Sequence, residues 1–310
     1  MKAALKSFPK DEHTLVAQAT FDDIFQAVQS GAASHGIVPF ENSSNGAVIQ
    51  TLDLLGKDQG RYEDLLIEDE VYFPVEHYLL GHAPPQSPVN DEGDQSLAQD
   101  GRSGVPFYDL SYLAKISSHP QALGQCSTFL NKYCKHVELA ETSSTSKAAK
   151  DVLADTSGKT AAVASQLCAE LTGLTVLAKG VQKDSNNVTR FFILRRKPQH
   201  SDQGKPPEEK ASEAASEQYR TLVVFTVSHR EPGALANALA VFKKHDINLT
   251  GMHTRPSGEG MWQYLFFVEF EGRRMGESGD GTVDGALAEL ERVLSRMRWL
   301  GSWKDQGGRS

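Results

Sequence analysis

Up to about residue 195, segments with apolar residues at helical spacing alternate with short apolar segments typical of strands. A helix is predicted from Phe21, where apolar residues recur at helical spacing behind a capping pair, Thr20 and Asp23, and Gly31 ends it. A short apolar strand follows at 36–39. This alternation of helix-like and strand-like segments predicts a mainly parallel sheet covered by helices.

The same alternation continues further along. An apolar stripe at helical spacing predicts a helix over 120–134, and small apolar residues at 161–164 predict a buried strand. Ser165 is placed to cap the next helix, which Gly173 closes. Another strand is predicted at 188–194.

Two stretches lack this patterning. Residues 83–104 mix Pro, Gly, Asp and Gln, which is typical of a surface loop. Residues 196–218 are polar, contain Pro and have almost no large apolar side chains. The second stretch is therefore predicted to be a linker that divides the chain.

Beyond the linker the predicted order is strand, helix, strand, strand, helix, strand, the βαββαβ arrangement of ferredoxin-like domains. The second helix has the clearest apolar face, from Val283 to Met297. The predicted bounds are 220–228, 233–245, 247–255, 262–270, 282–297 and 299–303.

Composition narrows the range of functions. The chain of 310 residues suits about two domains, and no apolar run approaches the ~20 residues of a membrane-crossing helix. The formal charge of −8 argues against nucleic acid or a membrane as partner, because anionic surfaces need clustered cations. The first nine residues resemble neither a signal nor a transit peptide, so a cytoplasmic location is expected.

Polar side chains gather where the strand at 36–39 runs into a turn. Asn42 and Ser43 can donate hydrogen bonds to a carboxylate, and ligands of open α/β sheets bind at such strand ends. For this stretch alone, a merely capped turn is an equally good interpretation.

His119, at a second strand-to-helix junction, could orient an anion or a water, although a lone histidine before a helix is more often structural. Nothing near it supplies further metal ligands, so no metal is expected. The three cysteines, Cys126, Cys134 and Cys168, lack metal-binding spacing and are expected to be buried apolar residues.

The sharpest cluster is Thr189 and Arg190, a hydroxyl beside a guanidinium at the start of a strand. Adjacent side chains on a strand point to opposite faces. Both serve one pocket only if the backbone bends, or if Arg190 faces the pocket while Thr189 approaches from the strand end. An edge-strand threonine and a surface arginine are the ordinary alternative.

Taken together, these segments resemble prephenate dehydratases over about residues 1–195, and the part beyond the linker resembles the ACT domain appended to them. The motifs that carry the resemblance are GIVPFENSSNGAV at 36–48, SHPQALGQC at 118–126, TSSTSKAAKDV at 142–152, AAVASQLCAELTGL at 161–174, NNVTRFFIL at 186–194, EPGALANAL at 231–239 and INLTGMHTRP at 247–256.

The resemblance implies an α/β fold. A two-lobed dehydratase domain, similar to type II periplasmic binding proteins, holds substrate in the cleft between its lobes, and a ferredoxin-like ACT domain follows. The expected bounds are 1–195 for the dehydratase domain, with lobe 1 at about 1–77 and 180–195 and lobe 2 at about 78–179, then 196–218 for the linker and 219–305 for the ACT domain. The hinge crossings are expected near 75–80 and 177–187.

The activity implied by the family is the decarboxylating dehydration of prephenate to phenylpyruvate in L-phenylalanine biosynthesis, without a cofactor. Thr189 is the expected donor to the departing hydroxyl. Arg190, Asn42 and Ser43 are expected to hold the carboxylate of the pyruvyl side chain. The resemblance implies as further substrate-binding residues Glu41, His119, Gln121, Ser143, Ser144, Ser165 and Phe191.

The ACT resemblance implies L-phenylalanine as allosteric effector, bound where two domains pair in a homodimer or homotetramer. A glycine at a helix start lets the backbone approach such a ligand. The expected effector-binding residues are Gly233, Ala234, Leu235, Asn248 and Leu249. Relatives often carry Glu-Ser where this chain has His253 and Thr254, which bears on the strength of regulation.

Family members begin with a strand and a Gly-Pro-x-Gly-type loop, and this chain starts with the segment that follows them. A missing internal strand is expected to leave unpaired backbone groups and a gap in the pocket wall, with reduced stability and activity. The competing function is a catalytically inactive or truncated phenylalanine-binding regulatory protein. A transport-type binding protein would share the two-lobed fold.

Overall fold

The computed structural model divides the chain into two compact units. One consists of Met1–Phe73 with Val188–Ser310, and the other of Pro74–Asn187, so the chain leaves the first unit and later returns to it. The residues that the structure describes are 2–9, 11–57, 61–83, 104–197, 218–276 and 281–307. The predicted loop at 83–104 and linker at 196–218 fall mostly outside them.

The unit bounds differ from the predicted lobe bounds. The second unit extends past the predicted 78–179 at both ends. The residues predicted as a separate domain at 219–305 belong to the first unit. The reason is that one eight-stranded sheet, in the order β11-β12-β10-β13-β3-β9-β1-β2, runs through both parts of this unit.

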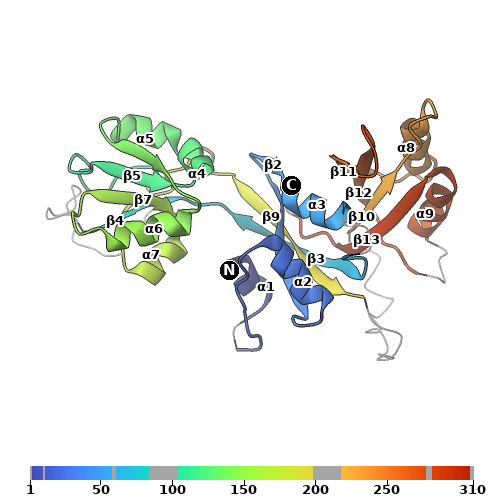
Figure 1. The fold of residues 1–310 in the computed structure, drawn as a ribbon, viewed down its shortest axis with the longest axis horizontal. Helices are drawn as coiled ribbons and strands as arrows, with labels where there is room; N and C mark the ends of the chain where they lie inside the picture. The colour runs from blue at the N-terminus through green and yellow to red at the C-terminus, as the bar shows by residue number, and fades with distance from the viewer. Residues whose placement is uncertain are drawn as a thin grey trace. The chain divides into compact units, whose positions relative to one another are not determined.

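The N-terminal part of the first unit is built on β1 and β9. Helix α2 begins as predicted, because Thr20 and Asp23 form a capping box. Strands β1 and β9 are antiparallel, with Ile37 opposite Ile193. The elements of this part are α1 (Lys2–Ser7), α2 (Phe21–Gln29), β1 (His35–Asn42), β2 (Gly46–Ala47), α3 (Ile49–Gly56), β3 (Leu65–Pro74) and β9 (Val188–Arg196) (Figure 1).

The C-terminal part of this unit, residues 219–304, is called the C-terminal module below. Its order of elements is the predicted βαββαβ, and its sheet order is β11-β12-β10-β13 (Figure 1). The elements are β10 (Tyr219–Thr226), α8 (Ala234–Lys244), β11 (Leu249–Pro256), β12 (Tyr264–Glu271), α9 (Thr282–Val293) and β13 (Arg296–Lys304).

The two faces of the module sheet enter different cores. Val223, Phe225 and Val268 pack under α8 and α9. Leu222 and Phe267, on the opposite face, join a core shared with the N-terminal part of the unit. Because side chains alternate along each strand, this sheet has apolar residues on both faces. The face that carries Leu222 and Phe267 packs against the part of the unit that contains β1 and β9.

A backbone contact at Gly301 connects β13 to β3, which run parallel there. Gly301 has φ of 152°, and a Cβ atom at this position would collide with the backbone carbonyl oxygen of Ile67. Only glycine allows this conformation and this approach. The continuity of the eight-stranded sheet thus depends on one residue without a side chain.

The second unit carries a five-stranded sheet in the order β6-β5-β7-β4-β8. Strand β5 is parallel to β6 and to β7, whereas β4 is antiparallel to β7 and to β8. Its elements are β4 (Tyr78–Gly81), β5 (Lys115–Ser118), α4 (Pro120–Gln125), α5 (Ser127–Tyr133), β6 (Glu138–Glu141), α6 (Thr145–Ala154), β7 (Thr160–Ala164), α7 (Gln166–Thr172) and β8 (Thr175–Lys179).

The sheets are mixed, so the prediction of a mainly parallel sheet was wrong. Helix-connected strands β5, β6 and β7 are parallel, but strands next to the crossings between units, such as β4 and β9, pair antiparallel with their neighbours. A crossing strand enters its sheet without the helical return that makes neighbours parallel.

Two predicted helices were too long. The helix over 120–134 is two helices, because Cys126 leaves the helical conformation with φ of −97° and ψ of 6°. The helix over 282–297 ends at Val293, because Leu294 is extended and Met297 pairs with Phe225 in the sheet. Apolar spacing continued past the helix end, since the following strand packs on the same core. Within the described ranges, no helix is long and apolar enough to cross a membrane.

Replacing Gly301 with alanine should destabilise the first unit. The new Cβ would collide with the backbone of Ile67, and the φ of 152° is unfavourable for alanine. Backbone strain of this kind costs about 1–3 kcal/mol, and we expect a lower midpoint of denaturant unfolding. Gly124→Ala is the control, because a Cβ there meets nothing within 4 Å; equal midpoints for the two variants would contradict the role of Gly301.

Candidate active site

The turn after β1 is closed by the side chain of Asn42. Its Oδ1 accepts hydrogen bonds from the backbone N–H groups of Ser44 at 3.1 Å and Asn45 at 3.0 Å. The side-chain amide of Asn45 donates to the same oxygen at 2.9 Å. The amide oxygen of Asn42 is therefore committed to the turn, which fixes the orientation of its Nδ2.

That nitrogen reaches across to the start of β9. Asn42 Nδ2 donates to Thr189 Oγ1 at 3.0 Å and to the carbonyl oxygen of Val188 at 3.3 Å. Asn42 and Thr189 are also cross-strand partners in the β1–β9 ladder. Because Thr189 Oγ1 accepts this hydrogen bond, its own proton is left to donate. The pair presents an oriented hydroxyl donor.

Ser43 secures the same junction through the backbone of Val188. The N–H of Ser43 donates to the carbonyl oxygen of Val188 at 2.9 Å, and Ser43 Oγ accepts from the N–H of Val188 at 2.9 Å. The structure thus brings together Asn42, Ser43 and Thr189, which come from two distant stretches of sequence.

Arg190 lies on the opposite face of β9 from Thr189. Its Nε donates to Glu70 Oε2 and its Nη1 to Glu269 Oε2, both at 2.6 Å. The three side chains are 3% exposed or less. Burial opposes the charge on Arg190, but the charges of Glu269 and Glu70 outweigh it and raise its pKa.

This placement differs from the expected role of Arg190. Two carboxylates of the protein already pair with its guanidinium, so a substrate carboxylate there would compete with them. Alternation along the strand accounts for the difference, because a residue next to Thr189 faces away from it.

The outer oxygens of both glutamates also receive donors. Arg220 Nη1 donates to Glu269 Oε1 at 3.1 Å, and Thr250 Oγ1 donates to the same oxygen at 2.7 Å. The N–H of Gln306 donates to Glu70 Oε1 at 3.2 Å. The four carboxylate oxygens are therefore all satisfied, which a buried ion pair requires.

A cavity of about 290 Å³ lies beside these groups. It is bounded by the turn after β1, the start of β9 and the strand β11 of the C-terminal module. Its lining residues are Glu41, Ser43, Tyr72, Val188, Arg190, Thr250, Gly251, Met252 and His253. Glu41, predicted as substrate-binding, is therefore beside the Ser43 turn.

In the second unit, several predicted residues follow neighbouring parallel strands at the same edge of the sheet. His119 follows β5, Ser143 and Ser144 follow β6, and Ser165 follows β7. Carboxyl ends of parallel strands are where ligands of α/β sheets bind. Their role in substrate binding stays a prediction.

Some of these side chains also have structural partners. His119 Nδ1 accepts from the N–H of Gln121 at 3.3 Å and caps α4, while Gln121 itself is exposed. Ser144 Oγ accepts from the N–H of Lys147 at 3.1 Å and caps α6. Ser165 Oγ donates to Cys168 Sγ at 3.5 Å. Helix capping therefore accounts for part of this pattern.

Phe191 lines a different cavity from the one beside Ser43. It lines a cavity of about 600 Å³ together with residues from Ala3 to Gln18 and from Ile24 to Ile37. Thr189 and Asn42 are not part of this lining, nor of the lining of the cavity beside Ser43. The predicted role of Phe191 in substrate binding stays a prediction.

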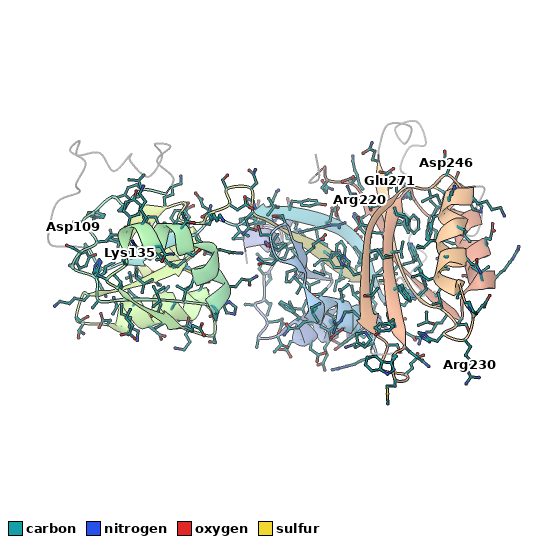
Figure 2. All side chains as sticks on the ribbon, turned by 90° about the horizontal axis from the view of Figure 1, so that it is seen from above. Asp109, Lys135, Arg220, Arg230, Asp246 and Glu271 are labelled. Carbon is teal, nitrogen blue, oxygen red and sulfur yellow. The ribbon has the colours of Figure 1, made fainter. Side chains whose placement is uncertain are left out.

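The predicted effector residues lie at the start of α8 and of β11. Gly233 has φ of 83°, a conformation that favours glycine. Asn248 is exposed and donates to Glu271 Oε1 at 3.0 Å, and Figure 2 labels Glu271 on the module. Ala234 is buried, and Leu249 is 37% exposed.

Sequence patterns missed Glu70 and Glu269, the partners of Arg190. Glu269 carries a usable signal, a carboxylate between apolar residues of β12, whereas Glu70 follows Glu68 and Asp69 on β3 and does not stand out. His77 was also missed. It is buried, and its Nε2 lies 2.7 Å from Gln125 Oε1. Burial lowers the pKa of His77 against the opposing hydrogen bond to Gln125, which favours a neutral ring at pH 7.

The cysteines are buried, as predicted, and none forms a disulfide. Burial raises the pKa of Cys126 to about 12 and that of Cys134 to about 11, so neither is a nucleophile at neutral pH. In the part of the chain that the structure describes, no cluster of three or more His, Cys, Asp or Glu side chains is arranged to hold a metal ion.

The protein-family model described as prephenate dehydratase matches residues 1–199 of the chain. A bifunctional chorismate mutase/prephenate dehydratase of Aquifex aeolicus is 33% identical over 97% of this chain and 69% of its own length. Arogenate dehydratase 1 of Petunia hybrida is 32% identical over 97% of this chain and 63% of its own length. The chain spans about two thirds of these relatives.

Two solved structures resemble nearly the whole chain. A prephenate dehydratase from Arthrobacter aurescens in complex with L-Phe has a TM-score of 0.76 and 26% identity, covering 99% of this chain and 87% of that one. A protein titled GqqA, a quorum quenching acylase, has a TM-score of 0.75 and 25% identity, covering 100% of this chain and 95% of that one.

Replacing Arg190 with alanine should destabilise the protein strongly. The change leaves Glu70 and Glu269 buried without their guanidinium partner, and breaking a buried pair in this way costs about 3–5 kcal/mol. Arg61→Ala is the matched control, since Arg61 and its partner Asp22 are 50% and 38% exposed and such pairs contribute about 0–1 kcal/mol. Denaturant unfolding measures both, and equal losses would contradict the account of Arg190.

Proposed function

Because the chain belongs to the prephenate dehydratase family, we propose that it catalyses the decarboxylating dehydration of prephenate to phenylpyruvate. The observation that carries the proposal is the hydrogen bond from Asn42 Nδ2 to Thr189 Oγ1, which orients a hydroxyl donor. In this reaction the bond to the ring carboxylate breaks and its electron pair enters the ring. The ring C–O bond breaks, and the hydroxyl leaves with a proton as water.

Thr189 serves the step that is hardest in solution, the departure of hydroxide. A donor must give the oxygen a proton or a strong hydrogen bond as the C–O bond breaks. A threonine of ordinary pKa acts as a positioned donor, and solvent supplies the net proton. Removing one positioned donor of this kind costs about 2.7–4 kcal/mol of barrier.

The pairing of Arg190 with two carboxylates fits the second part of the reaction, the decarboxylation. Decarboxylation moves the charge of the ring carboxylate into the ring, so a cation paired with that carboxylate would stabilise the reactant more than the transition state. Glu70 and Glu269 neutralise Arg190 and keep it 3% exposed. Arg190 lines the cavity beside Ser43, but its charge is already balanced by carboxylates of the protein.

Prephenate and arogenate are the two substrates to compare, because relatives named for each match this chain at similar identity. Arogenate carries an amino group where prephenate carries a keto oxygen, which leaves the ring chemistry unchanged. Purified full chain should release phenylpyruvate from prephenate. Turnover of neither substrate would reject the proposed activity.

The C-terminal module supports a proposal of regulation. Its βαββαβ topology suits an ACT-type domain, and a solved relative is titled as a complex with L-Phe. We propose that L-phenylalanine binds against the backbone at Gly233–Leu235 and against Asn248 and Leu249, where modules pair in a homodimer or homotetramer. The positive φ of Gly233 leaves this helix start open to a ligand.

Thr189→Val should lower kcat by about 10²–10³-fold and change KM little, since the hydroxyl acts in the transition state and valine keeps the shape. Steady-state kinetics of the full chain measure both constants. Thr189→Ser is the matched control, because it retains a hydroxyl, and it should keep most of the activity. Equal kcat in Thr189→Val and the parent would remove Thr189 from the mechanism.

L-phenylalanine should bind the full chain and raise its melting temperature in proportion to the logarithm of ligand concentration, because a ligand of the native state stabilises it. D-phenylalanine is the matched control and should give a much smaller shift. Binding together with changed turnover supports regulation. Binding without turnover of either substrate would favour the alternative of a catalytically inactive phenylalanine-binding protein.

A further inference from the structure

The β1–β9 ladder is irregular next to the candidate active site. Pro39 pairs with Phe191 and Glu41 pairs with Arg190, so Phe40 is an extra residue on β1. Such a bulge disrupts the ladder and bends the strand. The ladder is therefore irregular one residue away from Thr189, where contacts of side chains add to the hydrogen bonds of Asn42 and Ser43 in holding the backbone.

The side chain of Arg190 supplies those contacts. Its guanidinium carbon lies 5.6 Å from the ring centroid of Phe40 and 4.9 Å from that of Phe192. Tyr72 and Trp303 enclose it at 5.8 Å each. Cation–π contacts of a desolvated arginine add to its ion pairs, so the side chain anchors Arg190 next to the irregular step in the ladder.

One of the two carboxylates on Arg190 belongs to the C-terminal module. Glu269 lies on β12 and is itself held by Arg220 on β10 and Thr250 on β11. Arg220 in turn binds Asp305 Oδ2 at 2.7 Å, and Figure 2 shows Arg220 on the module. The position of the Glu269 carboxylate is therefore set by the module, and Glu269 in turn fixes Arg190.

We propose that Glu269 is a positioning residue for catalysis: acting through Arg190, it fixes the start of β9 and so the orientation of the Thr189 hydroxyl. The C-terminal module is then part of the catalytic apparatus as well as a place for an effector to bind. This inference rests on the proposed dehydratase activity and deepens it. A purely structural Glu269 would instead affect stability alone.

A second ion pair in the same unit provides a matched control. Arg255 on β11 donates to Asp53 on α3 at 2.7 Å and 3.1 Å, so it also joins the module to the N-terminal part. Neither residue belongs to β9 or to the Arg190 cluster. Asp53→Asn removes a module contact of the same chemistry without touching the proposed path.

Kinetics of the full chain test the inference. Glu269→Gln should lower kcat by about tenfold or more with KM changed by less than about threefold, since small misplacements of catalytic groups cost rate. Asp53→Asn should leave both constants near those of the parent. In a Thr189→Val background, Glu269→Gln should cause no further loss of kcat, because both changes act on one hydroxyl. A full additional loss there, or unchanged kcat in Glu269→Gln, would overturn the proposal.

Hydrogen–deuterium exchange provides a readout that does not need activity. Amides of residues 188–190 should exchange faster in Glu269→Gln than in the parent, and Asp53→Asn should leave them unchanged. If the parent has no turnover, the proposed function fails, and exchange alone decides whether Glu269 holds β9. Unchanged exchange would overturn the coupling.

Thr250→Val covers the case in which Glu269→Gln does not fold. It removes only the hydroxyl that donates to Glu269 Oε1, so the same pattern of lower kcat and faster exchange should appear at smaller size. If Thr250→Val has the kcat and the exchange rates of the parent, the proposal is wrong.

Discussion

The burial of one positive charge constrains most of the first unit. Arg190 is 3% exposed, and an unpaired guanidinium in such a place would be very unfavourable. Glu70 and Glu269 satisfy it from β3 and β12, so three strands from distant parts of the chain must meet around it. Gly301 helps to bring these strands together, because it lets β13 approach β3 and continue the sheet.

The alternation of side chains along β9 then divides two tasks between adjacent residues. Thr189 faces Asn42 and offers a hydroxyl, whereas Arg190 faces the core and secures the strand. The β-bulge at Phe40 makes the ladder irregular beside these two residues, which adds to the importance of the contacts of Arg190. Stability and proposed catalysis are thus linked through a single stretch of backbone.

Local signals predicted much of the fold. The capping pair Thr20 and Asp23 and the closing Gly173 work within a few residues of themselves, and the structure places them as predicted. The break at Cys126 and the end of α9 at Val293 were missed, because apolar spacing does not distinguish a helix from a following segment that packs on the same core.

The candidate site was predictable only in part, because local patterns do not identify partners that lie far apart in sequence. Turn chemistry and motifs singled out Asn42, Ser43 and Thr189, which the structure brings together. The partners of Arg190 lie 120 and 79 residues away in sequence, so no local pattern identifies them as its partners. Strand alternation indicated that the side chains of Thr189 and Arg190 would point to opposite faces of β9. Which of the two faces Asn42 could be learned only from the structure.

The central claim is that Thr189 meets the substrate while the guanidinium of Arg190 stays paired with Glu70 and Glu269. A crystal structure of the Thr189→Val protein with prephenate bound tests this directly. The account predicts the ring hydroxyl of prephenate beside position 189 and Arg190 still enclosed by Glu70 and Glu269. A substrate carboxylate on the guanidinium of Arg190, in place of either glutamate, would contradict it.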